Sequence, residues 1–365
     1  MKVECSFEKL KKYISLANRV VGKNTTLPIL ESVLLYTQDN SLKIRATNLD
    51  IGVEFSIHAK VIQQGNIAIP GNILIDVLAN IKNENSIILE LIGDNLTVSV
   101  KNNTILIRSL KPDDFPTLPK VDNGIQFTIP AKSFLSGLLS VHYSSAVSDI
   151  KPEYSSVFIY QESGTLIFVA TDSLRLAEKK IQNKNVEDFD GVIIPIKNIH
   201  EISKIVKDID GEIIIHFNKN QLSIVHKDIY ITTRVVNGIF PDYQQIIPKE
   251  STTNIIVLKQ DILDALKITN IFSDNFNKIN ININKKDKVC EINAKNDKGE
   301  NTTRIEAAIS GEDITANFNQ RHIMDYLQTA TDDSISISFN GENKPMVIRG
   351  VNNNSFLYII TQYKK

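Results

Sequence analysis

The sequence has very few of the residues that build covalent or metal frameworks. Of its 365 residues only Cys5 and Cys290 are cysteines, and they lie far apart in the chain. We therefore expect neither a disulfide scaffold nor a zinc cluster, and no metal or other cofactor. Two unpaired cysteines are typical of a reducing compartment, which favours a cytoplasmic protein.

Long apolar runs and an excess of charge of one sign are also missing. No apolar stretch approaches the roughly 20 residues of a membrane span, and the start MKVECSFEKL lacks the apolar segment of a signal peptide. The formal net charge is −1, which excludes a global basic field that wraps nucleic acid tightly. Any contact with DNA must therefore be local and weak.

The common catalytic motifs are absent as well. The chain contains no phosphate-binding loop with its Gly-Lys-Ser/Thr, and no GxGxxG, HExxH, GxSxG or CxxC pattern. Its six histidines show no spacing typical of metal ligands. We therefore do not expect an enzyme.

What the sequence does contain is a pattern of strand, helix and three strands in residues 191–236. A β-branched run ends at Pro195, which suits the first turn of a helix. The helix that follows has an apolar stripe at spacings of three and four, formed by Ile199, Ile202, Val206 and Ile209. Its opposite face is basic and contains Lys197, His200, Lys204 and Lys207.

The same pattern occurs at residues 66–110 and again from residue 314. Pro70 stands 125 positions before Pro195, and Asn319 stands 124 positions after it. A strand followed by a helix also opens each third of the chain. We therefore predict an α+β fold of three tandem copies of one domain, each with two helices on antiparallel sheets. The predicted domains are residues 1–121, 122–248 and 249–365.

Four strings connect this repeat with a known family. They are TLPIL at 26–30, ATNLD at 46–50, ATDSLRL at 170–176 and VNGIFPDY at 236–243. Together with the triplication, they resemble the bacterial DNA polymerase III beta subunit, the sliding clamp family, over the whole chain. The resemblance implies a DNA clamp fold and a head-to-tail homodimer that forms a six-domain ring, with the helices around duplex DNA. It implies a non-catalytic protein that gives the replicative polymerase processivity, and that also binds the clamp loader and repair proteins through short peptide motifs.

The resemblance also implies a partner site between the second and third domains. We call the following residues the partner site: Tyr154, Thr171, Ser173, Leu174, Arg175, Leu176, Pro241, Gln245, Ile246, Asn319, His322, Pro345, Ile359, Thr361, Gln362 and Tyr363. We expect Leu174, Leu176, Ile246 and Ile359 to offer apolar walls to a peptide. The tail ITQYKK is more polar than the methionine-containing tail usual in the family, so ligand preference is expected to differ.

Two further surfaces follow from the resemblance. The DNA-facing residues are Lys12, Lys23, Asn24, Asn72, Lys151, Glu153, Lys197 and Lys204. The dimer contact joins Lys101, Ile105 and Ile107 of one copy to Ile271, Phe272 and Glu300 of another. We expect Ile105 and Ile107 to be exposed on an edge strand, where a second chain would cover them. Since few charges lie there, the contact should depend more on strand pairing and apolar burial than on ion pairs.

Two alternatives remain open at this point. The first is a structural or adaptor scaffold of repeated antiparallel-sheet domains that is unrelated to DNA. The second is an uncharacterised hydrolase, which would need a cluster of perturbed acids or histidines that the sequence does not indicate.

Overall fold

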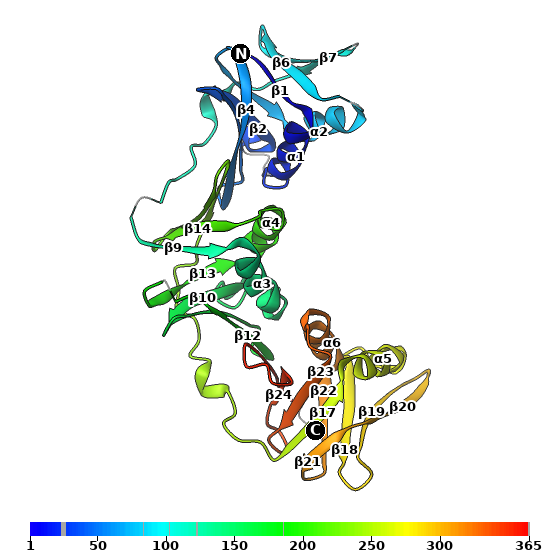
Figure 1. Ribbon diagram of the computed structural model, residues 1–365. Helices are drawn as coiled ribbons and strands as arrows, with labels where there is room; N and C mark the ends of the chain where they lie inside the picture. Colours follow the sequence, from blue (N-terminus) through cyan, green and yellow to red (C-terminus); the bar gives the residue numbers. More distant parts are fainter. Residues whose placement is uncertain (23–26, 83, 102, 122, 185, 364–365) are drawn as a thin grey trace. The chain divides into compact units, whose positions relative to one another are not determined.

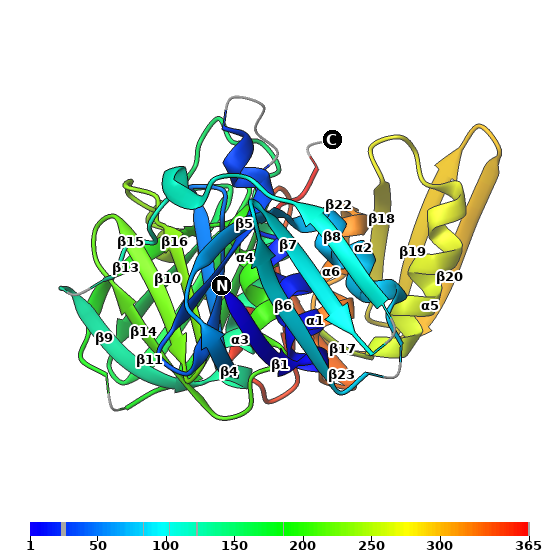
Figure 2. The ribbon, with the colours of Figure 1, turned by 90° about the horizontal axis from the view of Figure 1, so that it is seen from above.

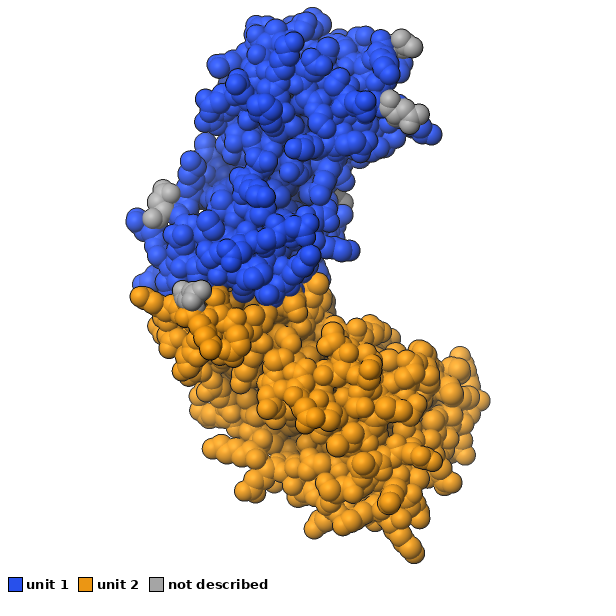
Figure 3. Space-filling view, in the orientation of Figure 1, with its two compact units in different colours: residues 1–135, 197–237 blue, residues 136–196, 238–365 orange. Residues whose placement is uncertain are grey.

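The computed structural model describes residues 1–22, 27–82, 84–101, 103–121, 123–184 and 186–363. The chain forms two compact units (Figure 3). Unit 1 consists of residues 1–135 and 197–237, and unit 2 consists of residues 136–196 and 238–365.

Eleven helical segments occur within these described ranges. The α-helices are α1 (Phe7–Asn18), α2 (Gly71–Asn80), α3 (Ala131–Val141), α4 (Ile196–Val206), α5 (Lys259–Thr269) and α6 (Gln320–Thr329). The 3-10 helices are η1 (Pro28–Glu31), η2 (Pro112–Asp114), η3 (His142–Ser144), η4 (Gln244–Ile246) and η5 (Asn270–Phe272).

Along the chain, the strands occur in the order that the repeat predicts. The first third contains β1 (Lys2–Ser6), β2 (Ser32–Gln38), β3 (Ser41–Thr47), β4 (Ile51–Gln63), β5 (Asn66–Pro70), β6 (Ser86–Ile92), β7 (Asn95–Val100) and β8 (Asn103–Arg108). The second contains β9 (Ile125–Pro130), β10 (Ser156–Glu162), β11 (Thr165–Thr171), β12 (Arg175–Gln182), β13 (Phe189–Pro195), β14 (Glu212–Phe217), β15 (Gln221–His226) and β16 (Ile229–Arg234). The last contains β17 (Thr253–Leu258), β18 (Lys278–Asn284), β19 (Val289–Asn296), β20 (Gly299–Glu306), β21 (Ala308–Gly311), β22 (Ile314–Asn319), β23 (Ser334–Phe339), β24 (Met346–Gly350) and β25 (Phe356–Ile360).

Unit 1 is built on one twelve-stranded antiparallel sheet. Nine of its strands follow the order β8-β7-β6-β1-β4-β16-β15-β14-β9, and Figure 2 shows β6, β7 and β8 side by side. The sheet continues from the first repeat into the second because β16 pairs with β4, with Thr233 opposite Ile51. Strands of two successive repeats therefore share one sheet.

Unit 2 repeats this arrangement between the second and third repeats. Its nine-stranded sheet has the order β13-β10-β11-β12-β25-β24-β23-β17-β21, and β25 pairs with β12 with Ile359 opposite Leu176. A second sheet has the order β20-β19-β18-β22. Helix α5 lies against β19 and β20 (Figure 2).

Helix amphipathicity explains how the helices cover these sheets. In α4 the predicted apolar stripe is confirmed, since Ile199, Ile202 and Val206 are buried and Ile209 is buried just beyond the helix. Burying each aliphatic side chain of this size contributes about 1.5–3 kcal/mol. Helix α1 packs beside α2, and α5 packs beside α6 (Figure 1).

One type of turn occurs three times, and successive copies are 124 residues apart. Asn48 accepts hydrogen bonds from the backbone N–H of Asp50 and Ile51 at 3.0 and 2.9 Å. Asp172 accepts from Leu174 and Arg175, both at 2.9 Å. Asn296 accepts from Lys298 at 2.9 Å. Each is an Asx turn, in which a short polar side chain bonds to backbone two residues ahead, and its recurrence supports the repeat predicted from the sequence.

Candidate partner-binding site

The partner site is centred on the turn from Thr171 to Arg175, all within unit 2. The hydroxyl of Thr171 donates to the carbonyl of Arg175 at 2.7 Å and accepts from the N–H of Ser173 at 3.1 Å. Ser173 has a φ of 75°, a backbone conformation that costs a non-glycine residue about 1 kcal/mol or more. The hydrogen bonds of Thr171 and Asp172 offset this cost and hold the turn in one conformation. Leu174, at its tip, is therefore presented to solvent and is 55% exposed.

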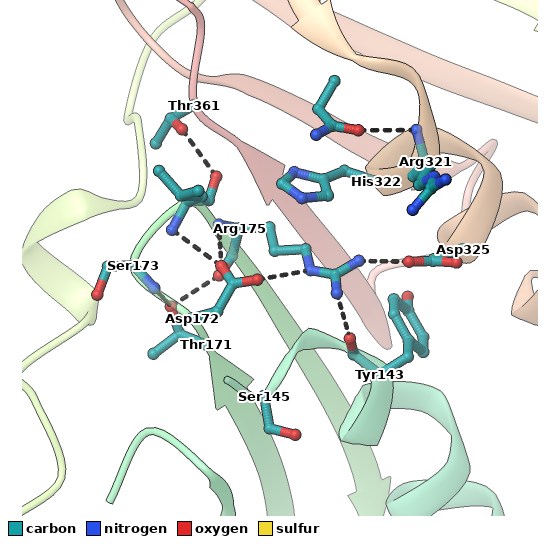
Figure 4. A network of polar contacts seen from close by, with 12 residues as sticks. Tyr143, Ser145, Thr171, Asp172, Ser173, Arg175, Arg321, His322, Asp325 and Thr361 are labelled. Atoms are coloured by element: carbon teal, nitrogen blue, oxygen red, sulfur yellow. Dashed lines mark hydrogen bonds and ion pairs between the residues drawn. The ribbon is translucent and has the colours of Figure 1, made fainter. Parts of the chain in front are cut away.

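Arg175 fixes this turn to two other segments of the chain (Figure 4). Its Nε donates to Asp172 Oδ2 at 2.9 Å, and one terminal nitrogen donates to the carbonyl of Tyr143 at 2.6 Å. The other terminal nitrogen forms an ion pair with Asp325 on α6. The guanidinium also lies 5.8 Å from the centre of the Tyr143 ring. Arg175 therefore joins β12, η3 and α6, and its charge is neutralised inside the protein.

The electrostatics of this network keep His322 neutral. Burial and the positive charge of Arg175 lower the pKa of His322 to about 4, although Asp172 and Asp325 act in the opposite direction. The imidazole points into the same region as Arg175 (Figure 4). At neutral pH the site therefore presents a neutral ring beside a neutralised guanidinium, and little net charge is available to attract a charged ligand.

Two of the four expected apolar wall residues are not accessible. Leu176 and Ile359 face each other across the β12–β25 pair, and both are buried. The expectation that they form open walls is therefore wrong for the described structure, in which Leu176 and Ile359 are 1% and 2% exposed. The apolar side chains that are available are Leu174 and Ile246, which are 55% and 53% exposed.

The C-terminal tail reaches the turn through backbone and side-chain hydrogen bonds. Both the N–H and the hydroxyl of Thr361 donate to the carbonyl of Leu174, at 2.9 and 2.8 Å. Asn319 caps α6 by accepting from the N–H of Arg321 at 2.9 Å, and its amide donates to the Tyr363 hydroxyl at 3.0 Å. The structure therefore brings the turn, the start of α6 and the tail together.

The remaining residues of the partner site make their contacts with near neighbours. Gln245 bonds to Asp242, and the N–H of Ile246 donates to the carbonyl of Tyr243 at 3.1 Å. The ammonium of Lys151 lies 5.4 Å from the centre of the Tyr154 ring. Pro241 is half-buried, Pro345 accepts at its carbonyl from Asn340 at 3.2 Å, and Gln362 donates to the carbonyl of Gly341 at 3.0 Å. The role of each in partner binding stays a prediction.

Sequence reasoning missed three residues that hold the site together: Tyr143, Asp172 and Asp325. A signal for two of them was present. Asp172 occupies the position of Asn48 in the repeated turn, and Asp325 occupies the position of Glu201 in the repeated helix, again 124 residues apart. Comparing the polar positions of the repeats would have found both.

The expected DNA-facing lysines on helices are paired with acids within unit 1. The Nζ of Lys12 lies 2.9 Å from Asp208, that of Lys197 lies 2.7 Å from Asp50, and that of Lys204 lies 3.4 Å from Glu201. All three pairs are at the surface, where an ion pair contributes about 0–1 kcal/mol. Such a pair can be exchanged for a phosphate contact at little cost.

The other expected DNA-facing residues are less informative. Lys23 and Asn24 lie outside the described residues. Asn72 is exposed in the first turn of α2, where its side chain accepts from the N–H of Ile73 at 2.9 Å. Lys151 is exposed and Glu153 is half-buried.

The expected dimer contact differs from the structure on one strand. Ile107 is buried and Ile105 is half-buried, because both point toward the core of unit 1. The expectation that they are exposed is wrong. Successive residues of a strand point to opposite faces, so the exposed face is that of the residue between them. The exposed apolar side chain of β8 is Leu106, at 60%. Lys101 is exposed just before this strand.

The corresponding elements of unit 2 fit the expectation better. Ile271 is 65% exposed, Phe272 is half-buried, and Glu300 is exposed, with its carboxylate 3.1 Å from Lys295. Strands β8 and β20 each stand at one end of a strand order. Of the described strands, these two therefore offer edges near the predicted contact.

Cys5 and Cys290 are both free and buried. The described parts of the chain contain no group of three or more His, Cys, Asp or Glu side chains placed to hold a metal ion. Burial, and then the negative charge of a neighbouring glutamate, raise the pKa of Cys5 and of Cys290 to about 12. Both thiols are therefore protonated and poorly nucleophilic. No helix within the described ranges is long and apolar enough to cross a membrane.

Family models of the DNA polymerase III beta subunit match nearly the whole chain. The N-terminal domain model matches residues 1–119, the central domain model residues 122–242, and the C-terminal domain model residues 244–364. The chain belongs to the DNA polymerase III beta subunit family. Membership confirms the predicted family and the predicted α+β fold of three tandem domains, each with two helices on antiparallel sheets.

Individual relatives agree with this assignment. The beta sliding clamp of Synechococcus elongatus is 25% identical over 369 residues, covering 99% of this chain and 98% of the relative. That of Buchnera aphidicola from Acyrthosiphon pisum is 26% identical over 363 residues, covering 98% of each chain. Among solved structures, the beta subunits of Thermotoga maritima and Pseudomonas aeruginosa have TM-scores of 0.94 and 0.95 and are 24% and 22% identical. The first match covers 100% of this chain and 99% of that one, and the second covers both chains fully.

The family assignment decides between the functional alternatives. The prediction of a sliding clamp that gives a DNA polymerase processivity is confirmed, and the adaptor scaffold unrelated to DNA is not supported. The clamp is a non-catalytic subunit rather than an enzyme, and its partners include DNA and the polymerase.

Proposed function

We propose that two copies of this clamp associate head to tail in a closed ring around duplex DNA. The ring tethers the replicative polymerase through a short peptide motif bound at the partner site, and the clamp loader and repair proteins use the same site. A polymerase held in this way rebinds its primer end intramolecularly, which raises processivity without any catalytic contribution from the clamp. The proposed domains are residues 1–121, 122–248 and 249–365, and the proposed location is the cytoplasm.

The observation that carries the proposal is the convergence of three segments at the partner site. The tail is joined by direct hydrogen bonds to the turn Thr171–Arg175, through Thr361 and Leu174, and to the start of α6, through Tyr363 and Asn319. Leu174 is exposed at the tip of this turn, and Ile246 of η4 is exposed in the same unit. A short extended peptide can bury apolar side chains against them while its backbone bonds to fixed groups. Because Arg175 is already neutralised, we expect apolar side chains of the peptide to contribute more than acidic ones.

Weak, sequence-independent contact with DNA is supported by the charges of the helices. The six α-helices carry nine basic and six acidic side chains. The basic ones are Lys9, Lys11, Lys12, Lys132, Lys197, Lys204, Lys259, Lys267 and Arg321. Five of these nine are paired with a carboxylate: Lys12, Lys132, Lys197, Lys204 and Lys267. Phosphates would exchange with these carboxylates, and a small net positive charge suits a ring that must slide.

Association of two copies is supported by the edges of β8 and β20. An edge strand offers a row of backbone donors and acceptors that a second strand can pair with. Leu106 on β8 and Ile271 beside β20 are both more than half exposed. We propose that these strands pair between copies, with Leu106 taking the role that we had expected of Ile107.

A processivity assay tests the proposed function directly. Primed single-stranded circular DNA is extended by the cognate polymerase and loader with an excess of competitor DNA, so that each product reflects one binding event. We expect longer products when this clamp is present, and no gain with the Leu174→Asp variant. Equal product lengths with and without the wild-type clamp would contradict the proposal. The matched control is Ile150→Asp, since Ile150 is an exposed aliphatic residue of the same unit outside the partner site.

A further inference from the structure

An open pocket of about 550 Å³ lies within unit 1. Its lining includes Leu34 and Tyr36 of β2, Arg45 of β3, and Gln64 and Asn66 where β5 begins. None of these residues belongs to the partner site, the DNA-facing residues or the dimer contact. The pocket is therefore a surface that the proposed function does not use.

The floor of the pocket is apolar and is formed by the fold itself. Leu34 is buried in a cluster with Ala68 and Phe115, and Tyr36 packs against this cluster. The guanidinium carbon of Arg45 lies 5.0 Å from the centre of the Tyr36 ring. Because Leu34 and Arg45 stand opposite each other on the paired strands β2 and β3, the floor exists before any ligand binds.

The polar groups beside this floor form an ion pair with a tyrosine. The Tyr36 hydroxyl donates to Glu54 Oε2 at 2.7 Å, and Arg45 donates to the same oxygen from Nε at 2.9 Å and from Nη2 at 2.6 Å. Nη2 also donates to the Tyr36 hydroxyl at 2.9 Å. No described residue accepts a hydrogen bond from Nη1 of Arg45. The pocket therefore offers a donor without a net charge, which suits a neutral acceptor.

The second repeat contains the same tyrosine and glutamate, with a group bound to them. Tyr160 and Glu178 lie 124 residues after Tyr36 and Glu54. The hydroxyl of Tyr243 donates to Glu178 Oε2 at 2.5 Å and lies 2.8 Å from the hydroxyl of Tyr160. In unit 2, a phenol of the chain itself thus binds the tyrosine–glutamate pair.

The linker of unit 1 has no such phenol at the equivalent position. Phe115 and Phe240 are equivalent residues 125 positions apart, so Leu118 occupies the position of Tyr243. Leu118 packs against β4, since a Cβ added to Gly52 would lie 2.3 Å from its Cδ2. Because leucine offers no hydroxyl, the linker of unit 1 does not bind the tyrosine–glutamate pair as Tyr243 does.

An aromatic ring of unit 2 is also replaced in unit 1. In unit 2 the ring of Phe158 stacks on that of Phe240, with centroids 4.8 Å apart. Gly191 leaves room for this ring, since a Cβ there would lie 2.2 Å from it. In unit 1 the equivalent positions hold the shorter Leu34 and Asn66. Both line the pocket, so the pocket lies where unit 2 has an aromatic ring.

We propose that this pocket binds a tyrosine side chain of a protein partner. The ring of the ligand packs against Leu34 and Tyr36, and its oxygen accepts a hydrogen bond from Nη1 of Arg45. The exposed side-chain amides of Gln64 and Asn66 bond to the backbone on either side of that tyrosine. A carboxylate or an ammonium group is a poorer ligand, because the charge of Arg45 is already neutralised. The proposal is independent of the proposed ring and of the partner site.

Methyl NMR of the full-length protein tests the pocket with p-cresol, which is the tyrosine side chain without its backbone. We expect a saturable shift of the methyl signals of Leu34 and Ala68. Toluene, the same ring without the hydroxyl, should bind about threefold to tenfold more weakly, the usual effect of one hydrogen bond. The absence of a saturable shift with p-cresol would overturn the site.

Two variants separate this site from nonspecific binding of phenols. Leu34→Phe with Asn66→Gly gives unit 1 the residues of unit 2 and fills the pocket, so the Ala68 signal should no longer respond to p-cresol. A wild-type response in this variant would overturn the location of the site.

The second variant, Arg45→Lys, tests the site whether or not the repacked variant folds. It keeps a positive charge beside Glu54 but removes the guanidinium fork, so p-cresol should lose its advantage over toluene. An undiminished advantage would overturn the role of Arg45.

A short peptide distinguishes a protein partner from a free phenol. The acetylated and amidated peptide Gly-Gly-Tyr-Gly-Gly adds backbone groups within reach of Gln64 and Asn66. We expect it to bind at least tenfold more tightly than p-cresol, and the same peptide with glutamate in place of tyrosine to bind at least tenfold more weakly than the tyrosine peptide. A tyrosine peptide that binds no more tightly than p-cresol would overturn the protein partner. Equal binding of the glutamate peptide would overturn the preference for a neutral phenol.

Discussion

Arg175 and Asp325 lie 150 residues apart in the sequence, and an ion pair joins their side chains. The pair connects β12 of the second repeat with α6 of the third. In unit 1, Arg19 forms the corresponding contact with Glu201 on α4, at 2.8 Å. Glu201 and Asp325 occupy the same position of the repeated helix. In both units, therefore, an arginine of one repeat holds the second helix of the next.

Removing Arg175 should destabilise unit 2. In Arg175→Ala, Asp172 and Asp325 lose their partner and the carbonyl of Tyr143 loses a donor. We expect the free energy of unfolding to fall by about 2–4 kcal/mol, because a half-buried carboxylate is left unpaired. Urea denaturation measures this change. In the control Arg19→Ala the lost pair is more exposed, so a decrease as large as that of Arg175→Ala would contradict the special role of Arg175.

The partner site should lose stability in acid through His322. The folded state lowers the pKa of His322 to about 4, below its ordinary value of 6.5. Between these values the unfolded chain binds a proton that the folded chain does not. The contribution of His322 is therefore complete above pH 6.5 and is lost as the pH falls toward 4. We expect His322→Gln to reduce the pH dependence of urea stability in this window. An identical slope for variant and wild type would contradict this.

Leu174 should determine ligand binding without affecting folding. A short extended peptide with apolar side chains, the ligand that we propose for the partner site, is a suitable probe for isothermal titration calorimetry. For Leu174→Asp we expect at least a tenfold loss of affinity and a change in unfolding free energy below about 0.5 kcal/mol, because the side chain is largely exposed. Wild-type affinity in the variant would remove Leu174 from the site. Ile150→Asp serves again as the control.

Lys197 and Lys204 should contribute to DNA contact through charge alone. Replacing both by Gln should lower the slope of log affinity against log salt by up to about 2, with no change in sequence preference. Fluorescence anisotropy with duplex DNA over a salt series measures this slope. The control is Lys285→Gln with Lys286→Gln, two exposed lysines of the β18–β19 turn. If the control lowers the slope as much as the helix variant does, the effect comes from total charge, and the assignment of Lys197 and Lys204 to DNA contact is contradicted.

Self-association should depend more on Leu106 than on surface charge. We expect Leu106→Asp to raise the dissociation constant at least tenfold, whereas Glu300→Gln should change it less than threefold because Glu300 is exposed and paired with Lys295. Sedimentation over a salt series completes the test. Dissociation of the wild type at high salt would contradict an interface formed by strand pairing and apolar burial.

The sequence predicted the fold well because the spacing of apolar residues, the alternation in the strands and the threefold repeat all indicate the same domain. The apolar stripe of α4 is buried as predicted, and neighbouring strands such as β6, β7 and β8 pair as hairpins, whereas the pairs β4–β16 and β12–β25 join strands that are distant in sequence. The face of β8 was wrong because Ile105, Leu106 and Ile107 are all apolar, so alternation gives no signal there. Asp172 and Asp325 both bind Arg175, and both were missed. Asp325 lies 150 residues from Arg175, and Asp172 bonds to it within a turn. A periodic pattern of apolar residues pairs neither.

Burial of Leu176 and Ile359 illustrates the same limit. Their apolar character predicts an interior position as well as a ligand wall, and only their burial in the folded chain decides between the two. The tail presents the opposite case. Its polar residues led us to expect only a different ligand preference, and the pattern gave no sign that Thr361, Gln362 and Tyr363 would each find a backbone partner in the folded chain.

Retention on DNA tests the central claim of a closed ring most directly. The clamp is loaded onto a nicked circular plasmid with its loader, free protein is removed by gel filtration, and half of the sample is cut once by a restriction enzyme. We predict that the clamp stays on the circle at a salt concentration that abolishes direct DNA binding, and that it leaves the linear DNA. Equal retention on both forms, or loss from both, would contradict a ring that encircles DNA.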